Sequence, residues 1–229
     1  MMNTLQRLYL WACERLYAEL AWSYDSVSWL VSWGAWDRWR AVVLDYIRGP
    51  RVLELGFGTG SLLATLVERG YQATGLEFSP AMHRETARKL ARRGLVVPRV
   101  QAPAQMMPFA DGSFDTIVAT FPSAYIVDPA TLRECARLLR WPTPAVPDNG
   151  GRLVVVMGVS ASHSPLSLLL SLLSPRSAAA HPLVDPLLAR FAAAGLTASH
   201  LTVPQGKTLV HLILAEPNAM AEGGEQRKS

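Results

Sequence analysis

The sequence has little cysteine, no long uninterrupted apolar run and no sign of an export signal at its start. Cys13 and Cys135 are the two cysteines in 229 residues, and no C-x-x-C pair occurs, which excludes a disulfide framework and a cysteine zinc site. The apolar stretch from 166 to 173 contains two serines and falls short of the ~18 residues of a membrane-spanning helix. Because Arg7 and Glu14 interrupt the first apolar segment, we expect a cytoplasmic protein.

Charge is also scarce, at 17% of residues against 50% hydrophobic ones, which excludes a disordered chain and a charged coiled coil. The length indicates one domain with a small helical appendage. The net charge is +4, and much of the excess lies between residues 81 and 100, where Glu85 is the one acid. This cluster is typical of a solvated helix face, with contact to phosphates as the alternative. Its basic members are Arg84, Arg88, Lys89, Arg92, Arg93 and Arg99.

Tryptophan is concentrated near the start of the chain. Apolar residues at helical spacing over 4–21 predict an amphipathic helix there. Indole rings suit the packing of such helices on a core, the lid of an apolar pocket, or a membrane–water interface, and all three interpretations stay open. Six of the seven tryptophans belong to this part of the sequence: Trp11, Trp22, Trp29, Trp33, Trp36 and Trp39.

From residue 51 onward, short apolar runs alternate with helical patterns, which predicts a doubly wound, mostly parallel α/β sheet. Two further runs around the turn Pro204-Gln205-Gly206 predict an antiparallel hairpin at the edge of a seven-stranded sheet. We expect a helical lid over 1–48, the α/β domain over 49–216 and a flexible tail over 217–229. The predicted strands cover 51–55, 72–77, 95–101, 114–120, 151–157, 196–203 and 207–215; the predicted helices cover 60–69, 80–93, 129–140 and 183–194.

A glycine-rich segment, Glu54-Leu-Gly-Phe-Gly-Thr-Gly60, lies where the first predicted strand turns into a helix. Glycines let the backbone bend sharply and approach a ligand closely. A dinucleotide loop needs its third glycine at position 61, which is Ser61, and a phosphate-binding P-loop needs a lysine that is absent. Glu54 suits a ligand with an ammonium or sulfonium group, and Glu77, at the end of the second strand, suits ribose hydroxyls. The two acids predict a site for a cationic nucleoside.

These residues resemble the class I S-adenosylmethionine-dependent methyltransferases, and among them the ubiquinone/menaquinone methyltransferase-like branch. The resemblance covers about residues 22–215 and rests on the glycine segment together with four further runs. Two departures are Pro103, where the family has an acid that receives the adenine amino group, and a proline-rich insertion over 141–149. The four runs are 77–82, 105–109, 111–115, and 138–140 continued by 150–153.

The resemblance implies a fold with a Rossmann-like sheet, S-adenosylmethionine as cofactor, S-adenosylhomocysteine as product, and particular site residues. Glu54 would orient the amino end of the cofactor, Glu77 would bind the ribose, and Phe78 and Met82 would pack on adenine. Tyr24 would begin the cofactor lid. The other implied cofactor contacts are Gly56, Phe57, Gly58, Thr59, Gly60, Gln105, Met106 and Thr120.

Methyl transfer from a sulfonium needs alignment, exclusion of water and at most a base, and no metal. Tyr24 and Tyr125 are the candidates for orienting the acceptor. We expect a lipophilic acceptor, a quinol-type ring or a phospholipid amine, reached through the tryptophan-rich segment 1–39 at a membrane surface, which would place the chain at the inner membrane face. Nucleic acid is not favoured as a partner, and the oligomeric state is left open. Alternatives are methylation of RNA or protein, binding of the cofactor without catalysis, and a nicotinamide oxidoreductase.

Overall fold

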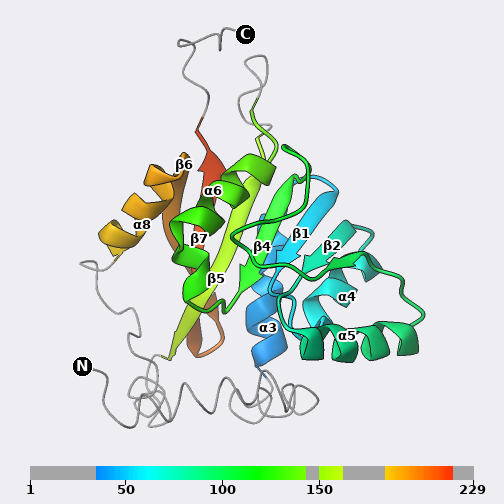
Figure 1. Ribbon diagram of the computed structural model, residues 1–229. Coiled ribbons are helices and arrows are strands. Elements are labelled where there is room, and N and C mark those ends of the chain that lie inside the picture. Colours follow the sequence, from blue (N-terminus) through cyan, green and yellow to red (C-terminus); the bar gives the residue numbers. More distant parts are fainter. Residues whose placement is uncertain (1–34, 143–149, 162–183, 219–229) are drawn as a thin grey trace, which may run out of the picture.

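The computed structural model describes residues 35–142, 150–161 and 184–218, which form a seven-stranded sheet in the order β3-β2-β1-β4-β5-β7-β6 (Figure 1). The first five strands are parallel, whereas β7 runs antiparallel to both of its neighbours. The predicted α/β class and the antiparallel C-terminal hairpin are thereby confirmed. The strands are β1 (Arg51–Leu55), β2 (Gln72–Leu76), β3 (Arg99–Val100), β4 (Thr116–Thr120), β5 (Arg152–Ala161), β6 (Leu196–Gln205) and β7 (Thr208–Pro217).

Helices cover both faces of the sheet (Figure 1). On one face the core is completed by α6 (Pro129–Leu138) and α8 (Val184–Ala193). On the other it is completed by α3 (Trp36–Ala41), the 3-10 helix η2 (Val42–Tyr46), α4 (Ser61–Glu68) and α5 (Pro80–Arg92). Successive strand residues serve opposite faces, as a pleated strand requires: Val52 faces the second cluster and Leu53 the first. Within the three described segments, no helix has the length and apolarity needed to cross a membrane.

Two of the helices begin as their sequences predict. The Ser79 hydroxyl accepts a hydrogen bond from the amide of Met82 at 3.3 Å, and Pro80 occupies the first turn of α5. Asp128 accepts from the amide of Ala130 at 2.8 Å and starts α6 in the same way. These caps fix the residue at which each helix begins.

Three predicted strand boundaries were wrong. The strand predicted over 95–101 is reduced to the two residues of β3, because Pro98 has no amide hydrogen to donate and only its carbonyl accepts, from Gly75 at 2.9 Å. Phe114 makes a single bridge to Leu139 and lies outside β4. By contrast, β5 continues four residues past position 157, because β7 pairs with it up to Ala161 beyond a bulge at 156–158.

The turn of the hairpin also differs from its prediction. Pro204 and Gln205 are the last residues of β6, paired with Leu209 and Thr208, so the connection is only 206–207. A proline is tolerated there because β6 is the edge strand. The predicted amphipathic helix 4–21, Tyr24, four of the tryptophans, most of the insertion at 141–149 and the last eleven residues lie outside the described residues.

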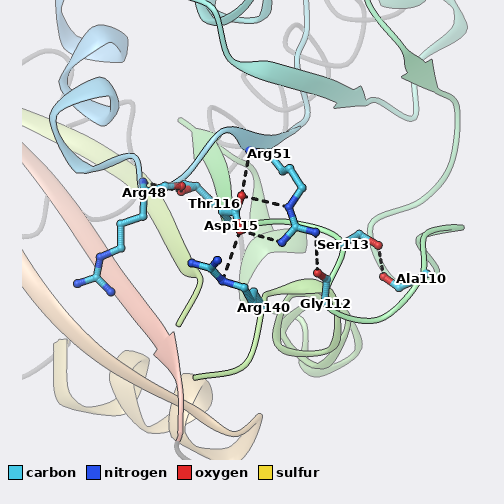
Figure 2. Close-up of polar contacts among 8 residues, drawn as sticks. All are labelled: Arg48, Arg51, Ala110, Gly112, Ser113, Asp115, Thr116 and Arg140. Carbon is cyan, nitrogen blue, oxygen red and sulfur yellow. Dashed lines mark hydrogen bonds and ion pairs between the residues drawn. The ribbon is translucent and has the colours of Figure 1, made fainter. Parts of the chain in front are cut away.

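A polar anchor joins the amino ends of β1 and β4 (Figure 2). The buried Asp115 carboxylate accepts from the Arg51 amide at 3.1 Å and from its guanidinium at 2.8 Å, and Arg140 lies 3.5 Å away. Beside it, the Thr116 hydroxyl donates to the carbonyl of Arg48 at 2.7 Å and accepts from the Arg48 amide at 2.8 Å. The anchor therefore lies at the opposite end of the strands from the glycine segment that follows β1.

Candidate active site

The glycine segment 56–60 connects the carboxyl end of β1 to α4. β1 lies between β2 and β4, and the helices that follow these strands cover opposite faces of the sheet. In open α/β sheets, a crevice forms outside the carboxyl ends of two strands whose following helices lie on opposite faces of the sheet. Ligands bind in this crevice. The candidate site is built around this crevice.

The backbone of the segment needs glycine at three places. Gly56, Gly58 and Gly60 have φ of 66°, 53° and 75°, in the left-handed region that L side chains rarely adopt. A Cβ atom at Gly60 would lie 2.4 Å from the Cγ2 atom of Thr86, and one at Gly56 would lie 2.6 Å from the Tyr125 hydroxyl. The segment therefore presents bare backbone.

Two side chains outside the segment hold its shape. The Glu77 carboxylate accepts from the amide of Gly58 at 3.0 Å through one oxygen and from the amide of Ser79 at 2.9 Å through the other. The Thr86 hydroxyl donates to the carbonyl of Gly58 at 2.8 Å. Both groups of Gly58 are thus fixed from β2 and α5, and Glu77, which we expected to bind ribose, already lies against the loop.

Glu54 is buried, with 2% of its surface exposed, and its Oε2 atom has no hydrogen-bond partner among the described residues. Burial raises the pKa of this carboxyl to about 8; the positive charge of Arg40 opposes the rise and the negative charge of Glu77 adds to it. Arg40 is itself buried and forms an ion pair with Asp37, and its Nε atom has no hydrogen-bond partner within the segments that the structure describes. A cation brought to Glu54 would therefore stabilise the ionised carboxylate.

Tyr125 lies in the 3-10 helix η3 (Ala124–Val127), and its hydroxyl donates to the carbonyl of Leu55 at 3.3 Å. Burial raises the pKa of this phenol well above its usual range, with the charges of Glu77, Cys135 and Glu54 adding to the effect. The hydroxyl therefore stays protonated at neutral pH. Its position over Gly56 allows it to donate a hydrogen bond but not to act as a base.

The remaining predicted contacts separate into exposed and buried side chains. Phe78 and Met106 are 70% and 72% exposed, so both are free to cover a ligand. Met82 and Phe57 are buried; Phe57 packs against the bare face of Gly75 and edge-on to a histidine ring 4.9 Å away. We therefore expect these two to support the site from behind rather than to stack on a ligand.

Three further predicted residues occupy the borders of the crevice. Thr59 is buried within the glycine segment, and Thr120 is the last residue of β4, at the level of β1's end. Gln105 is exposed and donates to Asp128 at 3.2 Å. Tyr24 lies outside the described residues, so its predicted role remains a prediction.

Sequence reasoning missed Thr86 and Arg40. Thr86 lies in the buried stripe of α5 with Met82 and Leu90, spaced four residues apart. A hydroxyl on an otherwise apolar stripe was the available signal, because a buried hydroxyl needs a partner. Arg40 gave no comparable signal, since its burial depends on where α3 packs against the sheet.

An aromatic pair lies where β4 ends. Phe121 has φ of 50°, an uncommon conformation for a residue with a bulky side chain, and its amide donates to the carbonyl of Val156 at 2.8 Å. Trp36 of α3 stacks on the Phe121 ring, with centroids 4.3 Å apart and planes inclined by 23°. This pair brings one of the six N-terminal tryptophans to the carboxyl edge of the sheet.

The basic cluster of α5 forms an exposed face. Arg88 pairs with Glu85 at 3.5 Å, and Arg93 pairs with Glu68 at 3.4 Å, all at the surface or close to it. Ion pairs of this kind are typical of a solvated helix surface. The geometry favours that interpretation over a phosphate-binding patch.

Comparisons with known proteins agree with the methyltransferase resemblance of the sequence motifs. The model of the family described as "Methyltransferase domain" matches residues 52–141. A demethylmenaquinone methyltransferase of Thermus thermophilus is 38% identical over 147 residues, which are 62% of this chain and 63% of that protein. The ubiquinone/menaquinone biosynthesis C-methyltransferase UbiE of Stenotrophomonas maltophilia is 33% identical over 135 residues, 55% of this chain and 53% of that protein. The matches thus span less than two thirds of these relatives.

Solved structures share the fold at low sequence identity. The geranyl diphosphate C-methyltransferase of Streptomyces coelicolor superposes with a TM-score of 0.56 at 15% identity, covering 79% of this chain and 78% of that one. The cyclase SpnF superposes with a TM-score of 0.57 at 19% identity, covering 81% and 82%. These likenesses establish the architecture alone.

Residues 52–141, which include the glycine segment, are similar to the methyltransferase domain family, and the sheet shares the architecture of solved methyltransferases. Over 135–147 residues the chain is similar to demethylmenaquinone and ubiquinone/menaquinone methyltransferases, the branch that its motifs resemble.

Proposed function

We propose that the chain transfers a methyl group from S-adenosylmethionine to a lipophilic, quinol-type acceptor. The observation that carries the proposal is the buried Glu54 carboxyl beside a bare glycine segment, because its Oε2 atom has no hydrogen-bond partner in the described part of the chain. The donor's ammonium and sulfonium groups supply positive charge that can pair with such a carboxyl. The homologues named as demethylmenaquinone and ubiquinone/menaquinone methyltransferases support the quinol-type acceptor.

Each residue of the crevice has a defined part in this proposal. When bound, S-adenosylmethionine supplies a methyl group already activated by its positive sulfur. Glu54 orients the cationic end of the donor. Glu77 accepts hydrogen bonds from the ribose hydroxyls, either in place of the two backbone amides that it now binds or together with them. Phe78 and Met106 exclude water from the purine. Tyr125 donates a hydrogen bond near Gly56. Alignment and exclusion of water are the main protein contributions to a displacement of this kind.

The acceptor side of the proposal includes the aromatic pair of Trp36 and Phe121, whose flat surfaces suit an aromatic ring. A phospholipid amine is the alternative acceptor, and contact of segment 1–39 with a membrane surface belongs to the same proposal. The non-catalytic alternative is a chain that binds the donor without turning over any acceptor. The fold alone does not define a reaction, since a cyclase, SpnF, shares it.

Titration calorimetry with S-adenosylhomocysteine tests the donor site. Wild type should bind it and not bind NAD, and Gly58→Val should lose binding, whereas Gly94→Val is the matched control because Gly94 also has positive φ but has open space around it. Since the pKa of Glu54 is about 8, a cationic ligand at pH 7 should also release protons, seen as a dependence of the heat on the buffer's ionisation enthalpy. Glu54→Gln should abolish that release. Tight binding of NAD instead would contradict the proposal.

A further inference from the structure

Between β3 and β4 lies a segment that has no helix or strand of its own. It comprises residues 101–113 and carries Met106, one of the two exposed side chains that are free to cover a ligand. Because β3 runs parallel to β2, the segment begins at the edge of the sheet where Glu77 lies. A stretch of this length keeps one shape only if other elements fix its backbone, since each ordered residue costs conformational entropy.

Contacts on both sides of the donor crevice show where the first part of this segment runs. The side-chain amide of Gln101 donates to the carbonyl of Phe78, just past the end of β2, at 3.4 Å. The side-chain amide of Gln105 donates to Asp128, the cap of α6, at 3.2 Å. Since β1 lies between β2 and β4 in the sheet, residues 101–105 extend across the crevice outside the carboxyl end of β1.

Two side chains of α6 hold the backbone directly after Met106. The Glu134 carboxylate accepts from the amide of Met107 at 2.7 Å, and the Arg137 guanidinium donates to the carbonyl of Met107 at 3.0 Å. The Met107 side chain is buried in the core cluster that α6 completes. Both backbone polar groups and the side chain of this residue are therefore fixed from the α6 side, while its neighbour Met106 points into the open.

The Arg137 guanidinium uses all of its hydrogen-bond donors. It carries five N–H groups, and the structure gives it five hydrogen bonds. Two go to the two oxygens of Glu134, each at 2.8 Å, and form a bidentate ion pair. The other three go to the carbonyls of Met107 and Phe109 and to the carboxylate of Asp111. A lysine cannot reproduce this set, because its three donors lie on a single nitrogen.

The charges of the pair strengthen its hold on the segment. The hydrogen bond from Arg137 lowers the pKa of Glu134 below its usual value; burial opposes this change, and the hydrogen bond from the Met107 amide adds to it. Glu134 is therefore a carboxylate at neutral pH, and its partner is a cation. Hydrogen bonds to charged groups are about twice as strong as those between neutral groups, so the pair holds Met107 more firmly than uncharged side chains would.

We propose that Glu134 and Arg137 are positioning residues for the methyl donor, which fix the backbone at Met107 and so hold Met106 in place for the purine. The inference rests on the proposed function, in which Met106 excludes water from the purine. Both residues act through Met107 rather than on the donor itself. A segment that is ordered in advance spares the ligand the entropy cost of ordering it, which strengthens binding without a new contact.

Affinities for two ligands test the inference, because only one of them carries the purine. S-ribosylhomocysteine has the amino acid end and the ribose of S-adenosylhomocysteine but no purine. In titration calorimetry with the full chain, Arg137→Met should weaken S-adenosylhomocysteine about 30-fold and change S-ribosylhomocysteine less than about twofold. Arg137→Lys should lose nearly as much, because an ammonium cannot replace the planar fork. Arg133→Met, which removes an exposed arginine of the same helix, should match wild type.

Hydrogen exchange of the full chain gives a readout that needs no ligand. Amides of residues 102–110 should exchange about ten-fold faster in Arg137→Met, whereas those of β1 should be unchanged, which also shows that the variant is folded. Glu134→Gln is the second variant should Arg137→Met fold poorly. It keeps an acceptor for the Met107 amide and removes the ion pair, so it should weaken S-adenosylhomocysteine about 5-fold with the same selectivity for the purine.

Three results would overturn the inference. They are an unchanged affinity of Arg137→Met for S-adenosylhomocysteine, an equal loss for both ligands, which would indicate a purely structural role, and wild-type affinity in Arg137→Lys, which would indicate that charge alone matters. Glu54→Gln provides the opposite pattern, because it acts on the amino acid end and should weaken both ligands alike. Failure of the proposed function is recognised separately, since wild type would then bind neither ligand while hydrogen exchange still reports on the segment.

Discussion

Gly60 and Gly94 share a positive φ, 75° and 67°, but differ in what lies beyond their α-carbons. A methyl group at Gly94 meets open space, whereas one at Gly60 meets Thr86 at 2.4 Å. Gly94→Ala should therefore lower the free energy of unfolding by about 1 kcal/mol, the cost of a left-handed L residue. Gly60→Ala should cost about 2 kcal/mol more, because the neighbour cannot be compressed. Urea unfolding measures both.

The clash itself is checked by a second substitution. Thr86→Ser removes the Cγ2 atom and keeps the hydroxyl that holds Gly58, so it should recover part of the loss in Gly60→Ala. Equal losses for Gly60→Ala and Gly94→Ala would show that backbone strain alone makes the glycine necessary.

Sequence reasoning was strongest for residues whose chemistry is unusual in a core. Glu54 and Glu77 stand out because acids seldom end buried strands, and both are buried beside the glycine segment. Phe57 and Met82 show the opposite case: their place in a motif indicated ligand contact, whereas the structure packs both side chains inside. Apolar residues serve core and site equally well, so sequence alone does not separate the two uses.

The short helix α3 connects the beginning of the described chain to the carboxyl edge of the sheet. Trp36 stacks on Phe121, Trp39 binds Thr208 of the hairpin, and Arg40 acts on Glu54. Three residues of this six-residue helix thus act on three separate parts of the edge. An element of this size has little helical stability of its own, so these contacts must hold it in place.

A double-mutant cycle on Trp39 and Thr208 tests that dependence. Trp39→Phe keeps the aromatic packing and removes the N–H donor, and Thr208→Val removes its acceptor. The coupling energy of the pair should be about 1 kcal/mol in urea unfolding, and both single variants should bind S-adenosylhomocysteine more weakly. The cycle is needed because Thr208 also donates to the Gln205 carbonyl. A coupling near zero would mean that the apolar contacts alone seat the helix.

At the level of elements, periodicity located each described strand and α-helix of the α/β part, but not the ends of all of them and not the 3-10 helix at 124–127. The strand at 95–101 was overestimated because its apolar residues are interrupted by Pro98. The extension of β5 was missed because its last residues are Gly, Val, Ser and Ala, whose strand conformation is imposed by pairing with β7. Tertiary pairing of this kind leaves no mark in local composition.

At the scale of the whole molecule, the Asp115 carboxylate holds together the amino ends of β1 and β4. Burial raises the pKa of this carboxyl, but hydrogen bonds and the charge of Arg51, together with Arg140, outweigh the rise and bring it below its usual value. A folded pKa below the unfolded one means that the carboxylate stabilises the protein above the unfolded pKa. That contribution is lost as pH falls through the folded value.

Asp115→Asn should therefore lower the free energy of unfolding by about 2 kcal/mol at pH 7, and the difference from wild type should shrink as pH falls below about 3.8. Asp111→Asn is the control, because Asp111 is exposed and its ion pair with Arg137 is at the surface. Urea unfolding at pH 7, 5 and 3 measures the effect. A difference that persists unchanged at pH 3 would contradict it. Binding of S-adenosylhomocysteine should be the same in both variants.

The parallel direction of the first five strands was predicted from the alternation of strand and helix, which indicates a parallel sheet covered on both faces; the order of the strands was not predicted. The insertion of β7 between β5 and β6 completes a sheet whose class was predicted from sequence. The hydrogen bonds of His211 with Ser160 and His200 were not predicted. These partners lie 51 and 11 positions from His211 and meet it only after the hairpin folds back.

The distance between the Asp115 anchor and the glycine segment, at opposite ends of β1 and β4, has an evolutionary consequence. Variation in the loops at the carboxyl edge leaves the residues that secure the scaffold untouched, so acceptor preference is open to change by natural drift or laboratory selection without a matching loss of foldability. Libraries randomised around Phe121, Tyr125 and the β6–β7 turn are therefore the first choice for altering the acceptor of the proposed reaction.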